Sequence, residues 1–157
     1  MQKITPFLWF DGKAEEAANF YVSVFKNSKI LNIARFGEAG PGPEGTAMVV
    51  SFQIEGQIFS ALNGGPQYTF SPAISFLVDC ETQAEVDELW AKLTAGGKEV
   101  QCGWLTDKFG VSWQIIPRAF MEMMQDKDPV KSQRVFKAMM GMNKLDIATL
   151  QRAYRGE

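Results

Sequence analysis

The stretch "AISFLVDCETQAEVDELWAKL", residues 73–93, reads as a buried strand that runs into an amphipathic helix. Its first seven residues are mostly apolar and β-prone, which favours a strand over 73–79. Thr82 and Glu85 then have the spacing of a capping box, which marks a helix start. The apolar residues that follow have helical spacing: Val86, Leu89, Trp90 and Leu93. A Gly-Gly pair at 96–97 ends the helix.

The same order occurs earlier in the chain. "ITPFLWF" (4–10) is apolar and aromatic, which predicts a buried strand that ends at Asp11-Gly12. A helix follows, and we expect Asp11 to act as its N-cap or first-turn acid. Its predicted buried face consists of Ala14, Ala17, Ala18, Tyr21, Val24 and Phe25.

Further strands complete the first half. Residues 29–36 predict a strand, and the glycine- and proline-rich segment 37–45 predicts a mobile loop. Residues 46–62 predict two strands that turn at Glu55-Gly56, where glycine can adopt a positive φ.

The second half is predicted to contain one strand over 98–106 and another over 111–117, joined by a turn at Asp107–Gly110. Both halves therefore follow the order strand, helix, strand, strand, with one further strand in the first half. This order is an internal structural repeat of about 60 residues.

After Pro117 the pattern changes to helices rich in methionine. Asp128-Pro129 predicts an N-cap and first helical position, and Gly141 predicts the helix end. A last helix is expected after Asn143, a possible cap. We interpret the apolar stripes of these helices as core or subunit interface rather than as a cofactor site. The stripes consist of Val135, Phe136, Met139 and Met140, then Leu145, Ile147, Leu150 and Tyr154.

Composition narrows the functional classes. The chain has 157 residues and a net charge of −2, which predicts one domain without an electrostatic footprint for nucleic acid or membrane. No segment resembles a signal peptide or membrane span, so we expect a cytoplasmic protein. Cys80 and Cys102 are interpreted as free thiols. Since the sequence contains no histidine, any function must work without the commonest metal ligand and general base.

Several spaced motifs resemble the PhnB-like branch of the vicinal oxygen chelate superfamily, often labelled demethylubiquinone methyltransferase-like. They are "PFLWFDGKAEEAANFYVSVF", "GQIFSALNGGP", the stretch at 73–93, "CGWLTDKFGVSWQIIP" and the tail "AMMGMNKLDIATLQRAY". The superfamily includes glyoxalase I, extradiol dioxygenases and bleomycin-resistance proteins. The resemblance implies an α+β fold with a curved mixed sheet and outer helices. It also implies a single domain made of a first βαβββ module (about 4–63), a second module (about 73–117) and a helical C-terminal extension (118–157).

The resemblance also implies a small-molecule pocket on the concave side of the sheet, and a homodimer. Relatives that use a metal bind it through positions that correspond to Pro6, Ser60, Ala73 and Gln114 in this sequence. Only the Gln114 side chain is a plausible ligand, and one neutral ligand does not hold a divalent transition metal. We therefore expect neither a metal nor another cofactor.

The methyltransferase label has no support in the residues themselves. A Rossmann-type methyltransferase needs a glycine-rich turn between a parallel strand and a helix. The "GGP" at 64–66 lies between the modules and precedes no predicted helix, so we interpret it as a linker turn.

Strand alternation suggests which side chains face the pocket. If Gln114 faces the concave side, Ser112 and Ile116 do too, whereas Trp113 and Ile115 pack under the helices. By the resemblance, Ala73, Ser75 and Leu77 face the same side, as do Leu8 and Phe10. The expected ligand-binding set is Phe10, Ser60, Asn63, Phe70, Ser75, Cys102, Trp104 and Gln114.

Structural roles stand beside these functional ones. Gln114 is either a ligand-recognising amide or a buried amide satisfied by its surroundings. Cys102 is an inert buried thiol or, without a histidine to activate it, an unusual nucleophile. Phe10 and Trp104 are pocket walls or core. Asp107 is most simply a turn residue that accepts backbone hydrogen bonds.

Three functional hypotheses follow. The first is a metal-independent protein that binds an apolar or aromatic small molecule. The second is an enzyme, either a lyase or transferase that uses Gln114, Cys102 or Asp107, or a glyoxalase-type metal enzyme with unusual ligands. The third is a structural dimer with a vestigial pocket.

Overall fold

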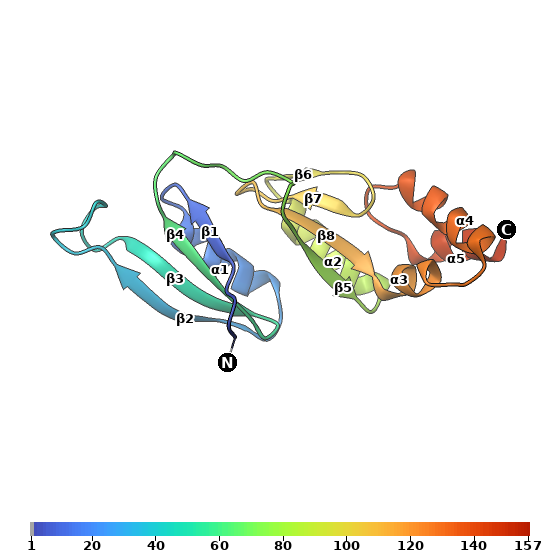
Figure 1. The fold of residues 1–157 in the computed structure, drawn as a ribbon, viewed down its shortest axis with the longest axis horizontal. Coiled ribbons are helices and arrows are strands. Elements are labelled where there is room, and N and C mark those ends of the chain that lie inside the picture. Colours follow the sequence, from blue (N-terminus) through green and yellow to red (C-terminus); the bar gives the residue numbers. More distant parts are fainter. Residues whose placement is uncertain (1) are drawn as a thin grey trace. The chain divides into compact units, whose positions relative to one another are not determined.

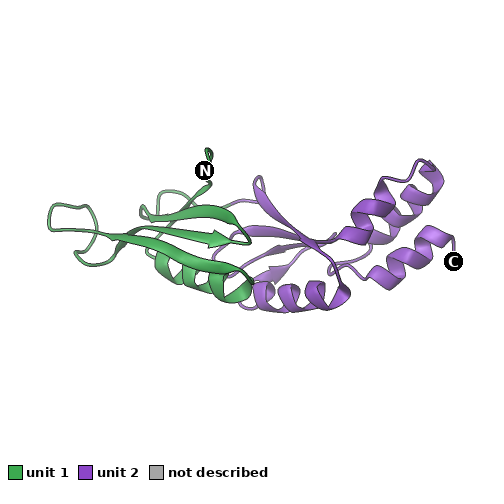
Figure 2. Ribbon diagram, turned by 90° about the horizontal axis from the view of Figure 1, so that it is seen from below, with its two compact units in different colours: residues 1–70 green, residues 71–157 purple. Residues whose placement is uncertain are grey.

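The computed structural model describes residues 2–157, which form two compact units. The first unit ends at Phe70 and the second begins at Ser71 (Figure 2), inside the segment expected to link the modules. Each unit has a mixed sheet with a helix packed on one face, so the fold is of the α+β class predicted from the sequence.

The first unit contains a four-stranded sheet in the order β1-β4-β3-β2 (Figure 1). β1 runs parallel to β4, and the other neighbours are antiparallel. Its elements are β1 (Phe7–Phe10), α1 (Ala14–Val24), β2 (Ser28–Arg35), β3 (Ala47–Ile54) and β4 (Gln57–Asn63).

The second unit repeats this arrangement in a four-stranded sheet of order β5-β8-β7-β6, with β5 parallel to β8. Its sheet and covering helix consist of β5 (Ser75–Cys80), α2 (Gln83–Thr94), β6 (Lys98–Glu99), β7 (Trp104–Thr106) and β8 (Ser112–Pro117). The extension adds α3 (Arg118–Met124), α4 (Pro129–Met140) and α5 (Ile147–Arg155).

The prediction of one strand over 98–106 is wrong. The chain reverses within this segment, and β6 pairs antiparallel with β7. The reversal uses left-handed backbone at two successive residues, Cys102 with φ 64° and Gly103 with φ 82°. Glycine adopts a positive φ easily, as at Gly103. The β-prone residues of the segment predict a continuous strand and give no sign of the turn. Both units therefore contain a complete βαβββ module.

Two helix caps differ from the predictions. Asp11 does not cap α1, whose N-cap residue is Lys13 and makes no side-chain capping bond. The last helix is capped by Asp146, not Asn143, and the Asp146 carboxylate accepts a hydrogen bond from the Thr149 amide. Asp128 does cap α4, as predicted.

The hairpin at Glu55-Gly56 is confirmed, with φ values of 48° and 84° typical of a type I′ turn. The glycine-rich loop 37–45 folds around Phe36, which is 8% exposed. A Cβ atom at Gly42 would lie 2.4 Å from Cε2 of that ring. Glycine at this position permits close packing against the ring.

The core of each unit lies between its sheet and its helix. In the first unit, the Tyr21 ring of α1 stacks on Phe52 of β3 with centroids 6.1 Å apart. In the second, Leu105, Trp113 and Ile115 are buried on the side of α2. We call the opposite face of each sheet its open face.

The turn before β8 is organised by a buried carboxylate. Asp107 is 2% exposed, and its Oδ1 accepts hydrogen bonds from the Phe109 and Val111 amides at 2.9 and 3.0 Å. Its Oδ2 accepts one from the Trp113 indole at 2.9 Å. The turn role expected for Asp107 is thus observed, and the indole bond adds a link to the strand that carries Gln114.

The helical extension has an apolar cluster of its own, which reaches the end of β8. The members of the cluster are Ile116, Phe120, Met123, Val135, Met139, Leu145 and Leu150.

No helix of residues 2–157 is long and apolar enough to cross a membrane.

We expect Asp107→Ala to lower the free energy of unfolding by about 3 kcal/mol, because it leaves buried N–H donors without a charged acceptor. Asp107→Asn keeps the shape and should cost less. Urea denaturation measures both, with Asp11→Ala, at an exposed position, as control. A change within about 0.5 kcal/mol for Asp107→Ala, the range of ordinary surface substitutions, would contradict this role.

Candidate functional site

Gln114 lies on the open face of the second sheet. The register pairs Trp113 with Phe76 and Ile115 with Val78 on the helix-covered side. Side chains alternate along a strand, so Ser112, Gln114 and Ile116 share the other side. This is the orientation expected for these residues from the sequence.

The Gln114 amide is positioned by its neighbours. Its Nε2 donates a hydrogen bond of 2.9 Å to the Ser75 hydroxyl of β5. In the sheet register Gln114 stands between Leu77 and Trp104, which we call the central row together with Gln114. Leu77 is 49% exposed, and Gln114 and Trp104 are half-buried. The central row therefore offers an aromatic ring, an aliphatic side chain and an oriented amide.

A second row carries hydroxyl groups. Ser75 and Thr106 both pair with Ser112 in the register, so we call these three residues the hydroxyl row. Ser75 and Thr106 are half-buried, whereas Ser112 is 2% exposed. The hydroxyl row and the central row contain no ionisable side chain.

Charged residues stand at both ends of this face. Lys98 pairs with Thr106 in the register and lies beside the hydroxyl row. Asp79 pairs with Ile116 in the register and forms an ion pair of 2.8 Å with Arg118. Hydrogen bonding to Asp79 raises the pKa of the Arg118 guanidinium above its ordinary value. Arg118 also contacts Glu81 at 3.2 Å, so these charges are engaged with one another at the surface.

The open face of the first sheet has a different composition from the one expected. Leu8 and Phe10 pair with Ala61 and Asn63, which lie on the side of α1, so their expected orientation toward the open face is wrong. The run 4–10 is apolar throughout and gives no alternation, and a shift of one residue exchanges the two faces. Trp9 instead lies on the open face.

Trp9 is held there by the segment that follows β4. Its indole donates a hydrogen bond of 2.9 Å to the Gly65 carbonyl, and its ring meets Tyr68 edge-on at 5.0 Å. A Cβ atom at Gly64 would lie 2.3 Å from Cζ2 of Trp9. The glycines at 64–65 therefore permit close packing, in keeping with a linker turn.

Ser60, from the expected ligand-binding set, is 7% exposed on the open face beside Phe7. Phe70 does not lie beside it but meets Phe10 edge-on, with ring centroids 5.2 Å apart. That contact belongs to the packing of the first unit.

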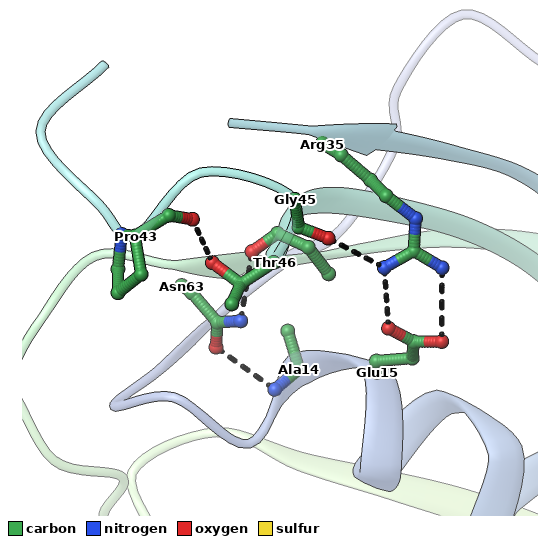
Figure 3. A network of polar contacts seen from close by, with 8 residues as sticks. Ala14, Glu15, Arg35, Pro43, Gly45, Thr46 and Asn63 are labelled. Carbon is green, nitrogen blue, oxygen red and sulfur yellow. Dashed lines mark hydrogen bonds and ion pairs between the residues drawn. The ribbon is translucent and has the colours of Figure 1, made fainter. Parts of the chain in front are cut away.

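Asn63 has a structural part in the same unit (Figure 3). Its Oδ1 accepts a hydrogen bond from the Ala14 amide at 2.9 Å, and its Nδ2 donates one to the Ala47 carbonyl. It thus supplies the cap that Asp11 was expected to supply. Nearby, Arg35 forms an ion pair with Glu15 and joins α1 to β2.

The two cysteines differ in environment. Cys80 is fully buried, and burial, followed by the charges of Glu85 and Asp79, raises the pKa of its thiol to about 12. Cys102 is half-buried in the turn before Trp104 and packs against the cluster of the helical extension. It is therefore placed beside the central row but partly covered.

Residues 2–157 contain no group of three or more Cys, Asp, Glu or His side chains that could hold a metal ion. The structure brings Ser75, Trp104 and Gln114 together, with Cys102 at their edge, whereas Phe10, Asn63 and Phe70 serve packing in the first unit. The open-face residues that the sequence analysis missed include Trp9 and Thr106. The pairing register of the strands identifies these residues, and no sequence pattern indicates which face they occupy.

A family model described as 3-demethylubiquinone-9 3-methyltransferase matches residues 2–116. No curated protein matches the chain. Among solved structures, a PhnB protein from Bacillus cereus is 44% identical over 74% of this chain and 99% of its own, with a TM-score of 0.70.

Two more distant structures share the fold. A protein from Pseudomonas aeruginosa is 22% identical over 74% of this chain and 98% of its own, with a TM-score of 0.64. A fosfomycin resistance protein from Listeria monocytogenes, solved with manganese(II) and sulfate, is 16% identical over 71% of this chain and 88% of its own, with a TM-score of 0.51.

We expect a disulfide-exchange reagent at pH 8 to modify one thiol of the native protein quickly, namely Cys102. Cys80 should react only after denaturation, because it is buried and its raised pKa keeps it protonated. Counting released chromophore before and after adding guanidinium measures this, and Cys102→Ser should abolish the fast phase. A fast phase that persists in Cys102→Ser would contradict the assignment.

Proposed function

The chain belongs to the family described as 3-demethylubiquinone-9 3-methyltransferase, as a PhnB-like member of the vicinal oxygen chelate superfamily, and we propose that it binds an uncharged aromatic or apolar small molecule without a metal. The methyltransferase description is the name of the family and assigns no reaction to this chain. The proposed site is the open face of the second sheet, around Gln114.

One observation carries the proposal. The Gln114 side chain is an amide fixed by Ser75 between an exposed leucine and a tryptophan. Its Oε1 accepts no hydrogen bond from the described residues, so a carbonyl acceptor is available beside an aromatic surface. Small-molecule sites combine apolar walls with a few oriented polar groups in this way.

The absence of charge in the central row favours an uncharged ligand. A buried ion without a partner costs several kcal/mol. The amide can accept a hydrogen bond from a ligand hydroxyl or N–H, and Trp104 can pack against a ring. We infer from the superfamily that the protein acts as a cytoplasmic homodimer.

We expect Gln114→Ala to weaken binding of such a ligand at least tenfold, about 1.4 kcal/mol, through loss of the fixed amide. NMR titration of the side-chain amide and indole signals with a library of uncharged aromatic fragments measures this. Gln133→Ala, at an exposed position of α4, is the matched control. A library in which no fragment shifts the Gln114 or Trp104 signals would overturn the proposal.

Metal analysis tests the proposal that the protein binds its ligand without a metal. Protein purified without chelators should contain far less than one equivalent of manganese, iron, nickel or zinc, because four suitable ligands are lacking. One tightly bound equivalent per chain would favour the alternative hypothesis, a metal enzyme of the glyoxalase type with unusual ligands.

A further inference from the structure

We propose that the helical extension forms an apolar wall at one end of the Gln114 site and limits its ligand to a single ring that carries a polar substituent. This inference rests on the proposed function and adds the shape and orientation of the ligand. It concerns the second unit alone.

The wall begins at Ile116, the next residue after Gln114 on the same face. Ile116 is only 4% exposed because it packs in the cluster of the extension, where Leu145 and Leu150 are fully buried. Cys102 lies two residues before Trp104 and packs against the same cluster. Both strands of the site are thus covered one step beyond the central row.

The segment that leads into α5 is attached firmly. The amides of Cys102 and Gly103 donate hydrogen bonds of 2.8 Å to the carbonyls of Met142 and Asn143. The Gly103 position tolerates little extra bulk, since a Cβ atom there would lie 3.2 Å from Cδ1 of Leu145. The wall is therefore built into the turn of the β6–β7 hairpin.

A second attachment comes from α2. The Gln83 side chain donates a hydrogen bond of 3.1 Å to the Leu145 carbonyl and accepts one of 2.7 Å from the Ile147 amide. Asp87 forms an ion pair of 2.9 Å with Lys144. With fixed points on both sides, the extension cannot move aside without breaking several polar contacts.

The space on each side of the central row follows from strand geometry. Successive residues on one face of a strand are about 7 Å apart, roughly the length of one substituted ring. In one direction a ligand meets the wall at Ile116, and in the other it meets the hydroxyl row. A ring on Trp104 would therefore direct a hydroxyl or carbonyl group toward Ser75 and Thr106.

The family model ends at residue 116 and does not include the extension, although the tail was among the motifs that resemble the PhnB-like branch. The wall is then a determinant of ligand size that belongs to this chain and to relatives with the same tail. It distinguishes short ligands from those with a long apolar chain opposite the polar group.

The test compares phenol, 4-ethylphenol and 4-hexylphenol on the full-length protein by NMR titration. Each added CH₂ group that is buried ordinarily strengthens apolar binding. We expect the wild type to bind 4-hexylphenol at least tenfold more weakly than 4-ethylphenol. Ile116→Ala should reduce or reverse this ratio, and Cys102→Ala, at a partly covered turn position, provides a second variant should Ile116→Ala fail to fold.

Val130→Ala, at an exposed position of α4, is the control that should leave the ratio unchanged. Tighter wild-type binding of 4-hexylphenol, or an unchanged ratio in every folded wall variant, would overturn the wall while leaving the proposed function intact. Failure of all three phenols to shift the Gln114 and Trp104 signals would overturn the choice of a phenol-like ring, and failure of the whole fragment library would overturn the proposed function itself.

Discussion

The buried Asp107 carboxylate is the interaction on which the second unit depends. It closes the turn between β7 and β8 by accepting hydrogen bonds from two backbone amides. It also accepts one from the indole of Trp113 near the start of β8. Because a slip of one residue would exchange the two faces of β8, this three-point attachment also decides that Gln114 faces away from α2. Asp107 thereby helps to orient the central amide of the candidate site.

Much of this architecture could be predicted from local patterns. The capping box at Thr82, the turn at Glu55-Gly56 and the N-cap at Asp128 have short-range chemistry that leaves clear signals, and the structure confirms all three. The orientation of Gln114 could also be predicted. Side chains alternate along β8, so its one amide points to the face opposite to that of Trp113 and Ile115.

Other features depend on contacts between distant segments. The cap of α1 comes from Asn63, almost fifty positions away in the sequence, and no pattern near Ala14 reveals it. The hairpin of β6 and β7 depends on left-handed backbone at Cys102, a conformation that the presence of a cysteine does not predict. The orientation of Trp9 rather than Phe10 is set by pairing with β4, since the first strand has apolar residues at every position. Long-range pairing, not composition, decides each of these.

The hairpin turn at Cys102 and Gly103 has a consequence for the chain as a folding unit. Its two outward amides are completed by carbonyls that are synthesised about forty residues later. Until that segment emerges, the second βαβββ module has two turn amides without these acceptors, next to an uncovered Ile116. Apolar side chains that are left uncovered favour association with other molecules. The last helices thus cover Ile116, and the segment before them supplies the acceptors for the turn, once this part of the chain has been made.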